Sequence, residues 1–453
     1  MEALEFRFGP LGSLAPFLSF LILVMICIYF GVPTINSLLL CVLIGLIIGI
    51  AFAKNIYQYC EAICEGMASK LAGVAVICWL YADLYGGMLR SAKIAEGLIW
   101  LGHEFSFTGG FFVAFTFMAC ALYATGCGTG IGTIATFTPF MYPAGIALGA
   151  NPGVLAAAIL SGATFGDNLA PVSDTTIISA ASQDTDIGGV VRSRFKYAII
   201  AATCAFLLFA IMGGHGEVTK DLVIEAGPKG LIMLVSPALV IAAALIGRHF
   251  LEAITWGILC TLVTGSLVGV FSYSDLVRIE HGSLVGSAVD GLVGMLGVCI
   301  LALLLTAISL LMQRGGLFQW VKTRILPKIA TNIRSAEFSI ISLVSVMNLC
   351  IPVNTVAMIA SGPWVKEIGE EFKLHPYRRA NLMDSISNSF VYAIPWCAPM
   401  LAIIASIRAT SFSYPFIPLL NWASIAPYHY YGYSLLIVMI LAALTGFGRK
   451  FEQ

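Results

Sequence analysis

Charged residues are scarce in this chain of 453 residues, and their scarcity limits what the protein can be. Only 11% of the residues are Asp, Glu, Lys or Arg, whereas 59% are hydrophobic, and the mean hydropathy is +0.93. Water-soluble domains usually carry about 25% charged residues. The composition therefore excludes an ordinary soluble domain and predicts an all-α polytopic membrane protein whose apolar surface faces a lipid bilayer.

An excess of charge of one sign is also missing, as are the motifs of several protein classes. The 24 basic and 24 acidic residues cancel, which argues against a nucleic-acid partner. There is no GxxxxGK[ST] loop to support ATP-driven transport, and no His, Cys or Ser constellation has catalytic spacing. The twelve Cys lie mostly inside apolar runs, which is typical of small buried residues rather than of disulfides. We therefore expect no enzyme activity, no cofactor and no nucleic-acid partner.

Apolar runs long enough to cross a membrane, by contrast, are abundant. The continuous runs are 15–31, 34–53, 69–89, 197–213, 230–247, 250–271, 290–312 and 432–447. Two further stretches, 154–190 and 380–407, are long enough to cross but are interrupted by polar, Gly and Pro residues, and two more, 109–146 and 336–365, have a break in the middle. These four interrupted stretches set the architecture apart from a simple helical bundle.

Basic residues, which concentrate on the cytoplasmic side of membrane proteins, assign a side to each loop. They cluster on both flanks of 336–365, near the C-terminus, and at Arg192, Arg194 and Lys196. Threading the runs through a bilayer then places both termini in the cytoplasm and gives about ten crossing segments. The solution requires 109–146 and 336–365 to be re-entrant hairpins, each entering and leaving on one side.

The two halves of the chain resemble each other in the order of these interruptions. Asn354-Thr355 lies at the end of the second hairpin break as Gly132-Thr133 lies at the end of the first, and Pro395 corresponds to Pro171. Opposite charge bias at the two hairpins is typical of inverted repeats, which bind substrate near the membrane midplane. The predicted organisation is an N-terminal repeat at 1–196 with hairpin 109–146 and broken helix 154–190, a linking helix and loop at 197–229, an inverted repeat at 230–408 with hairpin 336–365 and broken helix 380–407, and a loop and final helix at 409–453. We also expect a homodimer.

The segment SGATFGDNLAPVSDTTIISA, residues 161–180, carries the most chemistry. It places Asp167 and Asp174 in an otherwise apolar crossing segment, where a charge costs at least ~2.5–3.5 kcal/mol. Pro171 breaks the helix between them and leaves backbone carbonyls unpaired. Carboxylates, carbonyls and hydroxyls are the hard oxygen donors that Na⁺ needs, and a buried carboxylate also binds a proton, so the two ions would compete for one group.

This segment predicts a cation- and proton-binding site, with Na⁺ held at Asp167 and Asp174. The predicted binding residues are Asp167, Asn168, Ser173, Asp174, Thr175 and Thr176. The alternative is that the two carboxylates only cap helix ends at the mouth of a loop.

The breaks of the other interrupted stretches carry polar residues that could line the same site. The first hairpin break, TGCGTGIGT at 125–133, has glycines that allow close backbone approach, although their spacing also suits helix packing. The second break, at 348–355, and the crossing segment at 381–396 are richer in amides and hydroxyls. The predicted lining residues are Thr129, Thr133, Asn354, Thr355, Ser387, Asn388 and Trp396.

Two more acidic residues are secondary candidates. Asp384 lies beside Arg378 and Arg379, which predicts a surface salt bridge. Asp83 lies in the third apolar run, where a proton path and pairing with a polar neighbour are both open. The aromatic run 428–433 is typical of a belt at the membrane interface.

The sequence GDNLAPVSDTT at 166–176 resembles the GD-x-x-S-P-x-S-D-T-T signature of the NhaC family of Na⁺/H⁺ antiporters. The segments 382–385 and 394–396 are similar to the L-x-D-S and I-P-W elements of the same family. The resemblance implies two inverted repeats with re-entrant hairpins. It also implies a site lined by Asp167, Ser173, Asp174, Thr175 and Thr176, with Asp384 and Trp396 on the other repeat. Ala170 and Cys397 stand where many members have Ser and Asn, which leaves the ion and the stoichiometry open.

The leading prediction is a secondary active transporter of a bacterial-type inner membrane, namely a Na⁺/H⁺ antiporter that works by alternating access. Asp167 and Asp174 would bind Na⁺ on one stroke and a proton on the other. Because the wider family also resembles malate and lactate exchangers and amino-acid carriers, a Na⁺- or H⁺-coupled transporter of a small organic solute is the alternative. Phe390, Tyr392 and Trp396 would then shape the solute pocket.

Overall fold

The computed structural model describes residues 4–30, 34–68, 70–105, 107–171, 173–214, 227–246, 248–324, 331–351 and 354–452. The regular structure in these residues is helical apart from one short antiparallel hairpin, β1 (Arg278–Glu280) with β2 (Ser283–Val285). The helices of the first half are η1 (Gly9–Leu14), α1 (Ala15–Tyr29), α2 (Ile35–Ile50), α3 (Ile56–Met67), α4 (Lys70–Ser91), α5 (Ile94–Glu104), α6 (Gly109–Cys127), α7 (Gly130–Ala147), α8 (Pro152–Leu169), α9 (Asp174–Ser182) and α10 (Ile187–Met212). Those of the second half are α12 (Lys229–Ile232), α13 (Val235–Leu245), α14 (Phe250–Val268), α15 (Tyr273–Leu276), α16 (Ser287–Arg314), α17 (Leu317–Arg324), α18 (Ile333–Cys350), α19 (Asn354–Glu371), α20 (Pro376–Ser387), η3 (Phe390–Ala393), α21 (Ala398–Ser411), α22 (Trp422–Ile425), η4 (Ala426–Tyr428) and α23 (Tyr430–Thr445).

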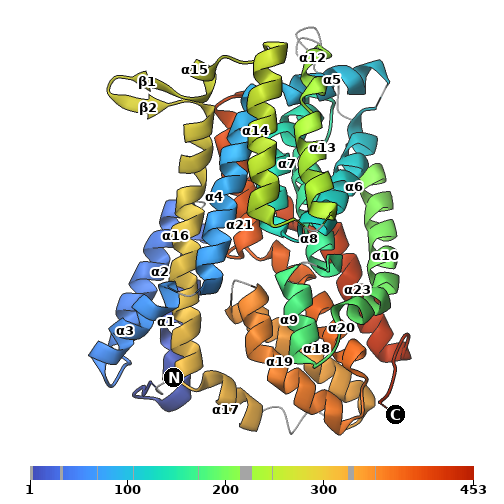
Figure 1. Cartoon of the computed structure of the whole chain (residues 1–453). Coiled ribbons are helices and arrows are strands. Elements are labelled where there is room, and N and C mark those ends of the chain that lie inside the picture. The colour runs from blue at the N-terminus through green and yellow to red at the C-terminus, as the bar shows by residue number, and fades with distance from the viewer. Residues whose placement is uncertain are drawn as a thin grey trace.

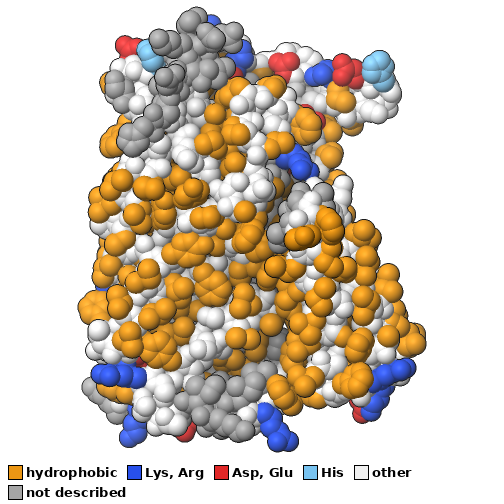
Figure 2. Space-filling model, turned by 180° about the vertical axis from the view of Figure 1, so that it is seen from behind, with side chains coloured by type: hydrophobic (Ala, Val, Ile, Leu, Met, Phe, Trp, Pro, Cys, Tyr) orange, Lys and Arg blue, Asp and Glu red, His pale blue; other side chains and the backbone are white. Residues whose placement is uncertain are grey.

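Many of these helices are long and apolar enough to cross a bilayer. Within the described ranges eight pass this test, or nine if the bent pair Trp422–Tyr428 and Tyr430–Thr445 counts as one span. Hydrophobic side chains cover the flanks of the molecule, whereas most Lys and Arg lie towards its two ends (Figure 2). The prediction of an all-α polytopic membrane protein is therefore confirmed, while the number of crossings stays a prediction.

Four helix breaks lie in the interior of the molecule, at the interrupted stretches of the sequence. The breaks separate α6 from α7, α8 from α9, α18 from α19, and α20 from α21 by way of η3. Gly128 ends α6 with a φ of 67°, a backbone conformation that only glycine adopts at little cost. Ala170 after α8 is extended because the next residue is Pro171, which disfavours helical geometry in the residue before it.

The interrupted helices lie in opposite halves of the molecule (Figure 1). The pair α6 and α7 lies in the upper half with α8 and α21, whereas α18 and α19 lie in the lower half with α9 and α20. The broken segments α8–α9 and α20–α21 thus each run from one half into the other. Both chain termini lie at the lower end.

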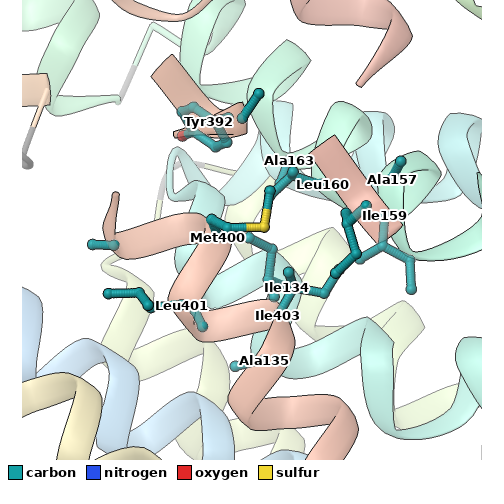
Figure 3. Packing of buried hydrophobic residues seen from close by; sticks show 14 of the residues in the cluster. Ile134, Ala135, Ala157, Ile159, Leu160, Ala163, Tyr392, Met400, Leu401 and Ile403 are labelled. Atoms are coloured by element: carbon teal, nitrogen blue, oxygen red, sulfur yellow. The ribbon is translucent and has the colours of Figure 1, made fainter. Parts of the chain in front are cut away.

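Close helix packing holds the upper ends of the breaks in place. A Cβ atom on Gly166 of α8 would lie 2.3 Å from the carbonyl carbon of Ala124 in α6, so glycine is required for these helices to touch. Nearby, Ile134 of α7, Leu160 of α8 and Ile403 of α21 pack in one apolar cluster (Figure 3). This core fixes the three helix ends that surround the break after α8.

The C-terminal segment is tied to the lower half through a buried acidic residue. Glu337 of α18 is fully buried and pairs with Arg378 of α20 and Arg449 beyond α23, each at 2.7 Å. The backbone N–H of His375 donates to the carbonyl of Lys450 at 3.0 Å. These bonds join α18, α20 and the end of the chain into one unit.

Candidate functional site

Asp167 lies in the last turn of α8, where the break brings it against the start of α7. Its Oδ1 accepts a hydrogen bond of 2.8 Å from the backbone N–H of Gly130, the first residue of α7, and its Oδ2 accepts one from the Tyr392 hydroxyl. A Cβ atom on Gly130 would lie 2.6 Å from Oδ2 and 2.5 Å from the tyrosine oxygen, so only glycine fits there. The amino end of a helix carries partial positive charge and stabilises an anion.

Asp174 is the first residue of α9, on the other side of the same break. Its Oδ1 accepts from the backbone N–H of Thr175 at 2.9 Å, and its Oδ2 accepts from the Thr355 hydroxyl at 2.7 Å. Thr355 lies in the first turn of α19, so two helix amino ends meet at one carboxylate. Asp174 is exposed, whereas Asp167 is only 7% exposed. The Asp174 carboxylate thus lies on the exposed side of the break, and the Asp167 carboxylate lies in its buried interior.

Hydroxyls and amides connect the two carboxylates and the two halves of the chain. The Thr175 hydroxyl donates to the backbone carbonyl of Asp167 at 2.8 Å and lies 3.0 Å from the Ser173 hydroxyl. The Asn388 amide, at the end of α20, donates to the Thr175 hydroxyl at 3.3 Å and accepts from Asn354 at 3.1 Å. The breaks predicted from distant parts of the sequence therefore meet in one network.

Asp384 forms a buried ion pair with Arg194 of α10, at 2.8 Å, and both side chains are fully buried. The carboxylate also accepts hydrogen bonds from Asn388 at 2.7 Å, from Ser179 at 3.0 Å and from Asn168 at 3.1 Å. The prediction of a surface salt bridge for Asp384 is wrong. Because α20 runs inward from Pro376, position 384 lies about two turns inside the molecule.

Arg194 is a site residue that the sequence assigned to a cytoplasmic cluster of basic residues. Its Nη1 donates to the backbone carbonyl of Asn168 at 2.5 Å and to the Thr176 hydroxyl at 3.2 Å, and its Nε donates to Asn381 at 3.2 Å. A cation at the carboxyl end of α8 complements the negative end of the helix dipole. Its spacing with the buried residues Val190 and Tyr197 of α10 is a pattern that could have identified it.

Other predicted lining residues stabilise the helix ends beside the network. Thr129 caps α7 by accepting from the backbone N–H of Gly132 at 3.3 Å, and the Thr133 hydroxyl donates to the carbonyl of Thr129 at 2.8 Å. The Ser387 hydroxyl donates to Asn348 at 3.0 Å, and the Trp396 indole donates to the carbonyl of Leu349 at 3.2 Å. Ser387 and Trp396 thus contact the end of α18 at the second hairpin break.

The aromatic run 428–433 contributes two buried residues, so the prediction of an interfacial belt is wrong for them. The hydroxyl of Tyr431 donates to the Asn168 side chain at 3.1 Å. His429 lies within hydrogen-bond distance of the Ser161 hydroxyl, at 3.0 Å, and of the Ser389 carbonyl, at 3.1 Å. Tyr392, which only the alternative prediction of an organic-solute transporter assigned to a site, contacts Asp167 directly. A histidine inside the aromatic run was the available signal.

The chemistry of this arrangement suits a small cation. The hydrogen-bond partners of Asp167 and Asp174 are neutral donors, whereas Asp384 is neutralised by Arg194. Among the described residues no three His, Cys, Asp or Glu side chains form a cluster that could hold a metal ion. The oxygen donors beside the two carboxylates are instead hydroxyls, side-chain amides and backbone carbonyls. Asp83, on α4, lies outside this network.

Broken membrane helices that enclose charged side chains in this way define a polytopic α-helical transporter fold. The chain matches the family model described as "Na+/H+ antiporter family" over residues 9–214 and 224–433, and it belongs to that family. The family resemblance inferred from the GDNLAPVSDTT segment is therefore confirmed.

Several curated proteins are similar to this chain. The malate-2H⁺/Na⁺-lactate antiporter of Bacillus subtilis is 28% identical over 41% of this chain and 39% of its own length. The Na⁺/H⁺ antiporter NhaC of Alkalihalophilus pseudofirmus is 24% identical over 46% of this chain and 48% of its own length. The arginine/ornithine antiporter ArcD of Halobacterium salinarum is 23% identical over 88% of this chain and 85% of its own length. The chain thus spans less than half of the first two relatives.

Proposed function

We propose that this protein is a secondary active antiporter that exchanges Na⁺ for H⁺ across the membrane. Asp167 and Asp174 are the carboxylates that bind Na⁺ and H⁺ in turn. Thr175, Ser173 and the backbone carbonyl of Asp167 supply further oxygen ligands, and Thr176 and Asn168 hold the break through Arg194 and Asp384. Family membership, which indicates a transporter rather than an enzyme, supports the proposal.

The observation that carries this proposal is the position of the two carboxylates on one helix break. Asp167 accepts its hydrogen bonds from α7 and η3, and Asp174 accepts its own from α9 and α19. Each of these donors is neutral, so a bound cation or proton would supply the missing positive charge. Two ions that compete for one set of carboxylates give obligatory exchange, because the empty, doubly charged site is costly at membrane depth.

The proposed mechanism is alternating access between two inverted repeats. The repeats are 1–196 and 230–408, with α6–α7 as the re-entrant hairpin of the first and α18–α19 as that of the second. Their location in opposite halves of the molecule supports this assignment (Figure 1). The protein would lie in a bacterial-type inner membrane with both termini in the cytoplasm, as a homodimer.

The test is proton flux in sealed proteoliposomes that contain the purified full-length chain. Addition of Na⁺, Li⁺ or K⁺ against an imposed pH gradient is expected to collapse the gradient with a preference for one cation. Asp174→Asn should abolish the response while the protein stays folded. Asp275→Asn, at an exposed carboxylate of α15, is the matched control and should transport as the unmodified chain does. Transport by Asp174→Asn at the control rate would contradict the assignment.

The second candidate is a Na⁺- or H⁺-coupled antiporter of a small carboxylate or amino acid. It is favoured by the relatives whose printed names are a malate-2H⁺/Na⁺-lactate antiporter and an arginine/ornithine antiporter, the latter aligned over 88% of this chain. In that case Tyr392 and Asp167 would contact the solute. Thermal stabilisation of the purified protein by malate, lactate, arginine or ornithine, with none by Na⁺ alone, would support this candidate over the first.

A further inference from the structure

A second buried carboxylate lies on α4, outside the network of the broken helices. Asp83 is fully buried, and neither of its carboxyl oxygens has a hydrogen-bond partner among the described residues. An ionised carboxylate without a partner is very costly in an apolar interior, and such a group normally becomes neutral instead. The other buried acidic residues of the described structure, Asp167, Asp384 and Glu337, all accept hydrogen bonds. Asp83 therefore differs from these residues because no described group donates a hydrogen bond to its carboxylate.

The side chain that could neutralise Asp83 lies close by but does not reach it. Arg90, seven residues further along α4, is 3% exposed, and its Nε and Nη1 have no hydrogen-bond partner among the described residues. Its Nη2 donates to the carbonyl of Ser287 at 3.3 Å. No hydrogen bond joins the guanidinium to the carboxylate in the described structure. An acidic and a basic side chain thus lie on one helix without a hydrogen bond between them.

The guanidinium of Arg90 and the carboxylate of Asp83 lie against two glycines of α16 that are about one helical turn apart. A Cβ atom on Gly291 would lie 3.3 Å from Arg90 Nη2, and one on Gly294 would lie 3.5 Å from Asp83 Oδ2. Three residues of an α-helix span about 4.5 Å. Because Asp83 and Arg90 lie on the same helix, a change of side-chain rotamer, rather than a movement of α4 as a whole, would bring the carboxylate and the guanidinium together.

The surroundings of the Asp83 carboxylate favour a proton over a metal cation. The position that a Cβ on Gly294 would take, beside Oδ2, is also 3.1 Å from the methyl group of Ala409. Glycine and alanine offer no side-chain oxygen, whereas Na⁺ requires several oxygen ligands. A proton requires only the carboxylate, and it removes the charge.

Among the titratable side chains around Asp83, Arg90 is the main candidate for pairing with its carboxylate. Helix α7 has no charged residue, and the charged residue of α14, Glu252, pairs with Arg248 at the surface. Arg408 of α21 is exposed. The remaining groups that face Asp83 or Arg90 are Asp290 and Cys299 of α16 and Tyr414, which donates to Glu96.

We propose that Asp83 is a second proton-binding carboxyl of this protein, separate from Asp167 and Asp174. It is neutral in the conformation described here, and it releases its proton to solvent when the Asp83 and Arg90 side chains change rotamer so that the carboxylate pairs with the guanidinium. This inference rests on the proposed proton antiport for its role in transport, but the protonation of Asp83 is measurable without transport.

The first experiment is infrared difference spectroscopy of the purified full-length protein in lipid nanodiscs, titrated from acid to alkaline pH without Na⁺. The carbonyl stretch of a protonated carboxylic acid is expected to disappear as the pH rises, and Asp83→Asn should remove that component of the spectrum. Asp275→Asn, at an exposed carboxylate, should leave it unchanged. A spectrum of folded Asp83→Asn identical to that of the unmodified chain would overturn the proposal.

A second variant keeps the proposal testable if Asp83→Asn does not fold. Arg90→Gln removes the cation that stabilises the ionised carboxylate, so the carbonyl stretch should persist to a pH about one unit higher. No shift in Arg90→Gln would overturn the pairing. If the unmodified chain moves no protons in response to any cation while the Asp83 band still titrates, the proposed antiport fails and the protonation site stands.

Discussion

Arg194 and Asp384 form an ion pair of 2.8 Å between α10 and α20, and neither side chain has any exposed surface. The pair joins the first half of the chain to the second at the helix break, because Arg194 also holds the carbonyl of Asn168 at the end of α8. A buried pair is costly to form, yet removal of one partner leaves an uncompensated charge. The contact between the two halves of the chain at this break therefore depends on both residues.

Arg194→Gln is expected to destabilise the protein by ~3–5 kcal/mol, because Asp384 would remain buried without its cation. The measurement is the thermal unfolding of the detergent-solubilised protein. The matched control is Lys54→Gln, which breaks an exposed pair with Glu5 at 3.0 Å and should cost about 0–1 kcal/mol. Equal melting temperatures for the two variants would contradict the prediction. The double variant Arg194→Met with Asp384→Leu should recover much of the lost stability, since it removes both charges.

Thr355→Val is expected to weaken Na⁺ binding, because it removes the hydroxyl that donates to Asp174 at 2.7 Å and keeps the side-chain volume. Loss of one hydrogen bond to a charged group costs about 1.5–3 kcal/mol, so the KM for Na⁺ should rise by roughly tenfold or more. The measurement is Na⁺-dependent proton flux in proteoliposomes. Thr355→Ser keeps the hydroxyl and should transport with a KM close to that of the unmodified chain. If the Ser and Val variants behave alike, the hydroxyl has no part in binding.

The membrane fold and the helix breaks could be predicted from the sequence because their causes are local. Apolar runs of spanning length identify helices, and Pro171 and Gly128 interrupt them whatever surrounds them. The 166–176 motif likewise places Asp167 and Asp174 on one break, because seven residues of chain cannot separate them far. These features depend on residues that are neighbours in the sequence.

The residues that sequence analysis missed owe their positions to pairing across the two halves. The bias of basic residues towards cytoplasmic loops predicts that Arg194 lies in a loop. Only its contact with Asp384, 190 positions away, shows that it is buried. Tyr431 and His429 read as interfacial aromatics, although they pack against Asn168 and Ser161 of α8. The prediction that Asp384 forms a surface salt bridge is wrong for the same reason. Such pairings follow from how α10, α20 and α23 pack, which no local pattern specifies.

Glu337→Gln is expected to loosen the C-terminal segment and to destabilise the protein by ~3–5 kcal/mol. The reason is that Arg378 and Arg449 both lose the carboxylate that they share at 2.7 Å. Limited proteolysis should cleave the segment after Thr445 faster in this variant, and thermal unfolding should occur at a lower temperature. Glu280→Gln, in the exposed hairpin pair with Arg278, is the control and should alter neither measurement. Resistance to proteolysis equal to that of the control would show that the buried pairs do not hold the C-terminus.

Gly130→Ala tests whether the amino end of α7 must touch the Asp167 carboxylate for transport. The added Cβ would lie 2.6 Å from Asp167 Oδ2 and 2.5 Å from the Tyr392 oxygen, so the carboxylate or the helix end has to move. A displacement of about 1 Å in a functional site can lower a rate by roughly 100-fold, and we expect a loss of that order in Na⁺-driven proton flux.

The control for Gly130→Ala is Gly73→Ala in α4, where an added Cβ would meet nothing within 4 Å. Alanine is favoured over glycine in helices by about 0.8–1 kcal/mol, so this variant should transport normally and unfold at the same or a slightly higher temperature. Size-exclusion chromatography and thermal unfolding of both proteins separate a site defect from misfolding. If folded Gly130→Ala transports as fast as Gly73→Ala, the bond from α7 to Asp167 is not needed, and the assignment of Asp167 to the ion site would have to be given up.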